Sequence, residues 1–166
     1  MPKATDIKPT GVTLYFLPVQ TRVPLKFGTE TLTSVTCARV CLKVADRAGR
    51  AAEGWGETPL SVQWVWPSSL PYQERHEALM AFCGKLAEAW AKFDVAGHPM
   101  EVGHAFISQR LGRMLEEFNR GRGGEPMPLL AALVCCSAFD IALHDAYGML
   151  LEKPTYQTYN ARYMSA

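Results

Sequence analysis

The sequence has almost no excess of either charge, since 17 lysines and arginines are balanced by 16 aspartates and glutamates in 166 residues. A chain this close to neutrality has no strong field to attract nucleic acid or an anionic membrane surface. It also lacks a hydrophobic stretch that reads as a signal peptide or a membrane span. We therefore expect no nucleic-acid partner and no membrane association.

The sequence also lacks the cysteine and histidine patterns of disulfide and zinc sites. Its five cysteines form an odd set without a C-x-x-C pair, and its four histidines do not repeat at i, i+4 beside an acid. Reduced thiols are typical of a cytoplasmic protein, which is the location we expect. Cys135 and Cys136 lie in an apolar stretch and are expected to be small core residues rather than nucleophiles.

The composition is that of a globular chain, with 48% apolar and 20% charged residues. Residues 1–10 mix prolines and charges without periodicity, so we expect a frayed lead-in. Strands are predicted over residues 11–19, 36–44 and 51–57, because the first is rich in β-branched and aromatic residues and the second alternates. In that second strand Ala38, Val40, Leu42 and Val44 form the apolar set. A short loop with Gly49 makes the last two strands antiparallel.

Helical spacing follows the strands. Apolar residues recur every three or four positions up to Phe93, which predicts one amphipathic helix that starts near Pro71. A second helix is predicted over residues 100–119. A third, over 129–151, is apolar around most of its circumference, as expected of a central, buried helix that ends before Pro154. The fold class is therefore α+β, a three-stranded antiparallel meander followed by a helical bundle.

Two segments carry recognisable motifs. Residues 137–156 read SAFDIALHDAYGMLLEKPTY, and residues 54–60 read GWGETPL. In this order they resemble the N-terminal capping domain of the enolase superfamily, of the mandelate racemase and muconate lactonizing enzyme type, where a glycine-rich third strand precedes helices that lead into a barrel. His144 stands where such enzymes often carry an aromatic residue, which leaves the subfamily open.

The resemblance implies a division into a flexible lead-in (1–10), a capping domain (11–154) and the start of a lead into a barrel (155–166). The chemistry of the superfamily is proton abstraction next to a carboxylate, with a lysine or histidine base and magnesium. Those groups lie on a (β/α)₈ barrel of roughly 250 residues. The resemblance thus implies that this chain holds no catalytic residue, metal ligand or cofactor, and that Mg²⁺ belongs to a full-length relative.

In such enzymes two loops of the capping domain close over the substrate, a carboxylic acid. The corresponding segments here are residues 21–34 and 58–69. The first offers Arg22, Lys26 and Phe27, with Gly28 as a flexing point, and the second offers Trp64 and Trp66 as apolar walls. Each has a plainer interpretation: the cations are solvated loop charges, and the tryptophans pack against the helices or a barrel.

Two other features, a pair of acids and an Arg-Gly cluster, each have a structural and a functional interpretation. Asp140 and Asp145 could be paired catalytic carboxylates, but acids at this spacing more often bind backbone or basic groups. The Arg-Gly cluster at 120–124 could touch RNA, but without interleaved aromatics a simple loop is favoured.

These observations leave two alternative functions for the chain. One is the capping domain of a dehydratase, racemase or cycloisomerase, inactive alone, with a barrel domain or a homo-oligomer as partner. The alternative is a stand-alone interaction module, in which the third helix and Tyr147, Tyr156, Tyr159 and Tyr163 expose an apolar patch.

Overall fold

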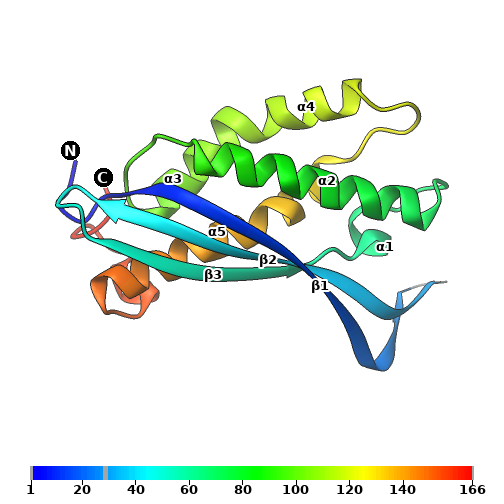
Figure 1. Ribbon diagram of the computed structural model, residues 1–166, viewed down its shortest axis with the longest axis horizontal. Helices are drawn as coiled ribbons and strands as arrows, with labels where there is room; N and C mark the ends of the chain where they lie inside the picture. The colour runs from blue at the N-terminus through cyan, green and yellow to red at the C-terminus, as the bar shows by residue number, and fades with distance from the viewer. Residues whose placement is uncertain (1, 28–29, 166) are drawn as a thin grey trace.

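The computed structural model describes residues 2–27 and 30–165, with Phe27 and Glu30 described by their backbone alone. Three strands, β1 (Ile7–Phe27), β2 (Glu30–Asp46) and β3 (Ala51–Pro59), form an antiparallel sheet in that order (Figure 1). The helices are α1 (Val62–Val65), α2 (Tyr72–Ala91), α3 (Pro99–Phe106), the π-helical turn η1 (Ile107–Leu111), α4 (Gly112–Arg120), α5 (Leu129–Leu151) and the 3₁₀ turn η2 (Thr155–Thr158). The predicted α+β meander and helices are confirmed, and the described residues form no barrel.

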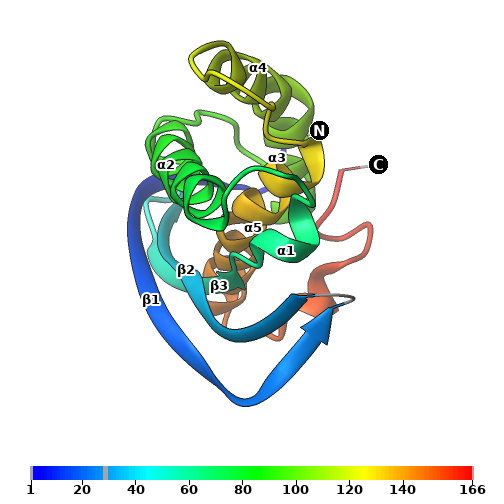
Figure 2. The same ribbon diagram turned by 90° about the vertical axis from the view of Figure 1, so that its right-hand side faces the viewer.

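The alternating pattern of β2 separates a buried face of the sheet from a solvated one. Helices α2 and α5 lie over the buried face (Figures 1 and 2). On the opposite face Arg39 pairs with Glu57 at 2.6 Å. Lys43 pairs with Glu53 at 2.7 Å. The four positions predicted to face the core, Ala38, Val40, Leu42 and Val44, are all completely buried.

β3 and α5 approach each other closely because glycine on the strand faces alanine on the helix. Gly54 and Gly56 lie on the buried face of β3, and a methyl group added to either would overlap the α5 backbone. Glycine inside a strand commonly marks such a close approach. The facing positions recur every four residues along one side of α5, and they are Ala138, Ala142 and Ala146.

Both long strands extend further than the sequence predicts. β1 begins at Ile7, inside the expected lead-in, and Ile7 is completely buried and joined to Gly97 by two backbone hydrogen bonds of 3.0 Å. At the other end β1 and β2 continue through most of residues 21–34, which the sequence analysis expects to be a loop. The pairing slips between Gln20 and Leu25, a stretch that contains Pro24, which has no N–H for the ladder. We call the described part of this extension, residues 20–27 and 30–34, the ribbon.

The predicted second helix begins earlier and contains an irregular turn. His98 caps α3 by accepting a hydrogen bond from the Met100 amide, and the Glu101 side chain accepts one from the His98 amide, which completes a capping box. The π-helical turn η1 separates α3 from α4, so the segment is one helical rod with a bulge in its middle. Side-chain periodicity alone does not reveal such a bulge.

α5 has the predicted bounds and is the central helix, packed against β3, β2, α2 and α3. By length and composition it is long and apolar enough to cross a membrane, contrary to the expectation that no stretch reads as a span. Half of its most apolar window is buried inside the protein, as in a core helix. It ends at Leu151, and the following residue, Glu152, caps it in a left-handed conformation (φ 52°).

The glycine contact predicts a large and local effect on stability. Gly54→Ala and Gly56→Ala should each lower the free energy of unfolding by about 3 kcal/mol or more, because the added methyl group meets backbone that cannot move aside. Gly84→Ala is the matched control: no atom lies within 4 Å of the added group, and alanine in a helix should stabilise α2 by about 0.5–1 kcal/mol. Urea denaturation of the three variants tests this, and equal stability of Gly54→Ala and wild type would contradict it.

Candidate functional site

The ribbon and the segment after β3 meet in an apolar pocket. The pocket has a volume of about 400 Å³. Figure 2 shows the ribbon curving beneath α1, so two segments far apart in the sequence become neighbours. Its lining residues are Leu25, Leu32, Val35, Pro59, Ser61 and Trp64.

The side chains that line this pocket are almost all apolar. Leu25 and Leu32 are directly paired across the ribbon. Trp64 is 55% exposed, so much of its indole ring is open to a ligand or to solvent. The one polar group is the Ser61 hydroxyl, whose oxygen is buried without a hydrogen-bond partner among the described residues. Such a pocket can hold an apolar group and orient it through one hydroxyl.

Of the residues that line the pocket, Trp64 is the one predicted from the sequence. Arg22 and Lys26 lie on the ribbon, are exposed and do not line the pocket. The side chain of Phe27 and the expected flexing point Gly28 lie outside the described residues. The remaining lining residues were missed because Leu25 and Leu32 become neighbours only through ribbon pairing, and that region reads as a loop in the sequence.

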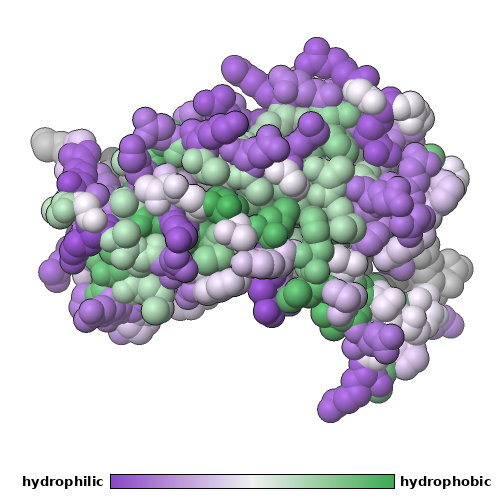
Figure 3. Space-filling model, in the orientation of Figure 1, coloured by the Kyte–Doolittle hydropathy of each residue, from purple (hydrophilic) through white to green (hydrophobic). Residues whose placement is uncertain are grey.

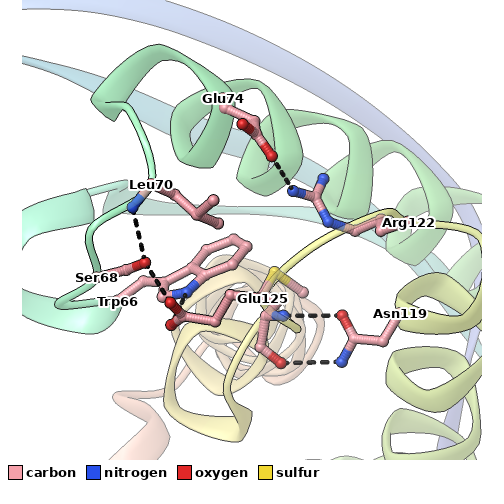
Figure 4. Close-up of polar contacts among 8 residues, drawn as sticks. Trp66, Ser68, Leu70, Glu74, Asn119, Arg122 and Glu125 are labelled. Carbon is pink, nitrogen blue, oxygen red and sulfur yellow. Dashed lines mark hydrogen bonds and ion pairs between the residues drawn. The ribbon is translucent and has the colours of Figure 1, made fainter.

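Trp66 occupies a different environment from Trp64. It is 1% exposed, and its indole N–H donates to the Glu125 carboxylate at 3.2 Å (Figure 4). The Arg122 guanidinium lies over the ring, 5.4 Å from its centroid. The backbone carbonyl of Trp66 accepts a hydrogen bond of 2.5 Å from the buried Arg75 side chain. Trp66 therefore packs against the helices, as its plainer interpretation holds.

The same contacts account for the Arg-Gly cluster at 120–124. Arg122 lies over both Trp66 and Phe118 and pairs with Glu74 at 3.4 Å. Just before the cluster, the Asn119 amide group both donates to and accepts from the Met127 backbone, at 3.0 and 2.8 Å (Figure 4). The loop is thereby tied to α2 and to the start of α5, which supports its structural interpretation.

A second group of polar side chains lies where α3, α5 and the tail meet. His98 is completely buried; its Nδ1 accepts the capping bond from Met100, so Nε2 carries the proton and donates to the Thr158 hydroxyl at 3.0 Å. Burial, with a smaller contribution from His144, lowers the pKa of His98 to about 4. His144 Nδ1 lies 2.7 Å from the Tyr159 hydroxyl. These contacts hold the tail against the body of the protein.

The carboxylates and thiols of α5 contact neighbouring parts of the chain or are buried in the core. Asp145 accepts a hydrogen bond of 2.8 Å from the Trp55 amide, which ties α5 to the edge of β3. Asp140 lies 3.9 Å from His144, and burial raises the pKa of this carboxyl. Cys135 and Cys136 are buried, and burial raises the pKa of the Cys136 thiol to about 12. Within the described part of the chain, no three histidines, cysteines or acids gather where they could hold a metal ion.

The solved structures that resemble this chain are enolase-superfamily enzymes of the mandelate racemase and muconate lactonizing enzyme type. An L-talarate/galactarate dehydratase liganded with Mg and L-glucarate matches 92% of this chain at 16% identity (TM-score 0.53), over 33% of its own length. N-succinyl Arg/Lys racemase from Bacillus cereus matches 90% at 18% identity (0.52), over 32% of its length. A dipeptide epimerase from Enterococcus faecalis, complexed with Mg and L-Leu-L-Tyr, matches 90% at 15% identity (0.51), over 34% of its length.

The chain thus has the fold of the N-terminal domain of these enzymes and spans about a third of their length. No protein-family model matches the sequence. The search of curated proteins found no match either.

The different surroundings of the two tryptophans predict different effects on stability. Trp66→Ala should lower the free energy of unfolding by about 3–5 kcal/mol, because a fully buried aromatic side chain and its polar contacts are lost. Trp64→Ala, at an exposed position, should cost less than about 1 kcal/mol. Chemical denaturation of the two variants measures the difference, and similar losses would show that Trp64 also belongs to the core.

The buried His98 predicts a pH dependence of stability. In the unfolded chain the His98 imidazole takes up a proton as the pH falls below 6.5. In the folded chain it does so only near pH 4. The contribution of His98 to the free energy of unfolding is therefore fully present above pH 6.5 and should fall, on the order of 2 kcal/mol, as the pH is lowered to 4. His98→Asn retains a capping side chain but cannot titrate, so its stability should vary less across this window. Denaturation at a series of pH values tests the slope, and an unchanged slope would exclude His98 as its cause.

Proposed function

We propose that this chain is the substrate-capping domain of an enolase-superfamily enzyme, spanning residues 11–154, and that it does not turn over substrate alone. The observation that carries the proposal is the pocket itself: the two segments expected to cap a substrate, the ribbon and residues 58–69, converge on one apolar hollow that contains Trp64. In this role the chain excludes water and holds the distal end of a substrate. The base and the metal carboxylates would belong to a barrel.

The lining of the pocket favours a particular kind of carboxylic acid. Five of its six lining residues are apolar, and the sixth offers one hydroxyl. A polyhydroxylated acid sugar needs several hydrogen-bond partners, and its polar groups would be costly to bury here. A substrate with an apolar distal group, such as a dipeptide or an N-acyl amino acid, fits better. This favours racemisation or epimerisation over dehydration, while Arg22 and Lys26 on the ribbon remain candidates for long-range attraction of the carboxylate.

We propose that Mg²⁺ binds to a barrel domain and that residues 155–166 lead toward it. The five cysteines are unpaired and buried, in keeping with a cytoplasmic protein.

The alternative, an interaction module, rests on exposed apolar side chains along α5 and the tail. Ile141, Met149 and Tyr156 are 47%, 62% and 85% exposed. However, Tyr147 and Tyr163, two of the four tyrosines expected in the patch, are buried by the chain itself. We therefore favour the capping domain.

The proposal is tested by following exchange of the substrate α-proton in D₂O by NMR. The chain is mixed with Mg²⁺, a hydrophobic dipeptide and the barrel of a dipeptide epimerase from which the N-terminal domain has been removed. We expect exchange in the mixture and none with the chain alone. Trp64→Ala and Leu32→Asp should reduce it at least about tenfold, because they remove the apolar walls. Trp55→Ala is the matched control, since Trp55 is similarly exposed (49%) but lies on the solvated face of the sheet.

Binding provides a second measurement that does not depend on a barrel. N-acetyl-leucine should shift the backbone NMR signals of Leu25, Leu32 and Trp64, whereas glucarate should not. Exchange catalysed by the chain alone would overturn the proposal, because it would place a catalytic site within these residues. Equal shifts by both acids would contradict the apolar specificity but not the capping role.

A further inference from the structure

A groove runs along α2 on the side that faces η1 and α4. It consists of two adjoining hollows, about 620 and 410 Å³ in volume, that share Lys85 and Met114. The face seen in Figure 3 is hydrophobic across its middle and hydrophilic along its upper edge, where α4 lies in Figure 1. Phe118 of α4 packs edge-on against Phe82 of α2 at 5.2 Å, which fixes the distance between the two walls. The groove shares no residue with the ribbon pocket, and its apolar floor is formed by Ala78, Ala81, Ala89, Phe93, Met114 and Phe118.

The two ends of the groove carry opposite charges. Around the start of α2 lie three carboxylates and one guanidinium; around its end lie three cations and one carboxylate. The acidic end consists of Glu74, Glu77 and Glu117 with Arg122, and the basic end of Lys92 and Arg110 with Glu88; Lys85 lines both hollows and is counted here with the basic end. Glu74 pairs with Arg122, but within the described part of the chain none of the other six forms an ion pair. Each end thus keeps charges free for a partner of opposite sign.

We propose that this groove is the interface of a homodimer, in which a second copy of the chain packs across it in the antiparallel direction. A two-fold axis near the middle of α2 places the acidic end of each copy on the basic end of the other, so the same attraction occurs twice. A pattern that is complementary to itself on reversal favours a second copy over a partner of uniform charge. The exposed residue at the middle of α2 is Ala81, whose small side chain allows the two α2 helices to approach closely.

The length and width of the groove determine how much surface area a dimer would bury. From Glu74 to Lys92 the helix rises about 27 Å, and the face is about two helix diameters wide. A dimer would therefore bury on the order of 1,000 Å² in total, at the lower end of specific interfaces. Because the charges lie at the surface, the dimer should weaken as salt is added.

Charge exchange tests the proposal. The pair Glu77→Lys and Glu117→Lys makes both ends basic, and the pair Lys85→Glu and Lys92→Glu makes both ends acidic. All four side chains are exposed, so the fold should be retained. In sedimentation velocity at low salt, each variant alone should dimerise at least about tenfold more weakly than wild type. An equimolar mixture of the two should regain a dimer, because an all-basic groove then meets an all-acidic one.

Two controls separate this interface from a general effect of charge. The variant carrying all four exchanges keeps the net charge and merely reverses the groove, so it should dimerise like wild type. Lys26→Glu with Lys153→Glu changes net charge as much as the acidic variant does but lies outside the groove, so it should leave the dimer intact. A wild-type chain that stays monomeric at every concentration, or a mixture that does not recover the dimer, overturns the proposal.

Discussion

The close contact between β3 and α5 is the constraint on which the rest of the structure depends. Gly54 and Gly56 leave no side chain between the strand and the helix, so the α5 backbone rests directly on the sheet. The Asp145 carboxylate then accepts the Trp55 amide at the edge of β3. The two motifs read from the sequence are the two sides of this one contact. It determines where β3 ends, and thereby where α1 and Trp64 lie relative to the ribbon.

The candidate site is built outward from that rigid contact. The ribbon continues from strands whose inner faces are packed against α2 and α5, so its position follows from the sheet. On the other side Trp66 and Glu125 tie the segment after β3 to the loop before α5 (Figure 4). The pocket is therefore held by two anchored segments, which fixes the positions of its apolar walls. The charged groove on α2 shares no lining residue with the pocket, so the proposed capping and the proposed self-association use different surfaces.

The sequence predicted some elements well, for identifiable physical reasons. The bounds of α5 and the inward face of β2 were correct, because burial imposes periods of 3.6 and 2 on the apolar residues. The ribbon was missed because its threonines, its one proline and its cations are typical of a loop, and only the pairing between β1 and β2 shows that it is a strand extension. Of the two tryptophans proposed as pocket walls, only Trp64 lines the pocket. Trp66, two residues later, lies beyond the turn of α1 and faces the core.

The sequence by itself determined the class of fold, the order of the elements and the residues that let β3 and α5 touch. These properties depend on local periodicity and on the presence or absence of a side chain at single positions. Only the tertiary structure decided which residues line the pocket, which histidine is buried, and that free charges along α2 and α4 form one groove with opposite ends. Those properties depend on distances between segments far apart in the chain, and such distances follow from packing of the whole core rather than from any local pattern.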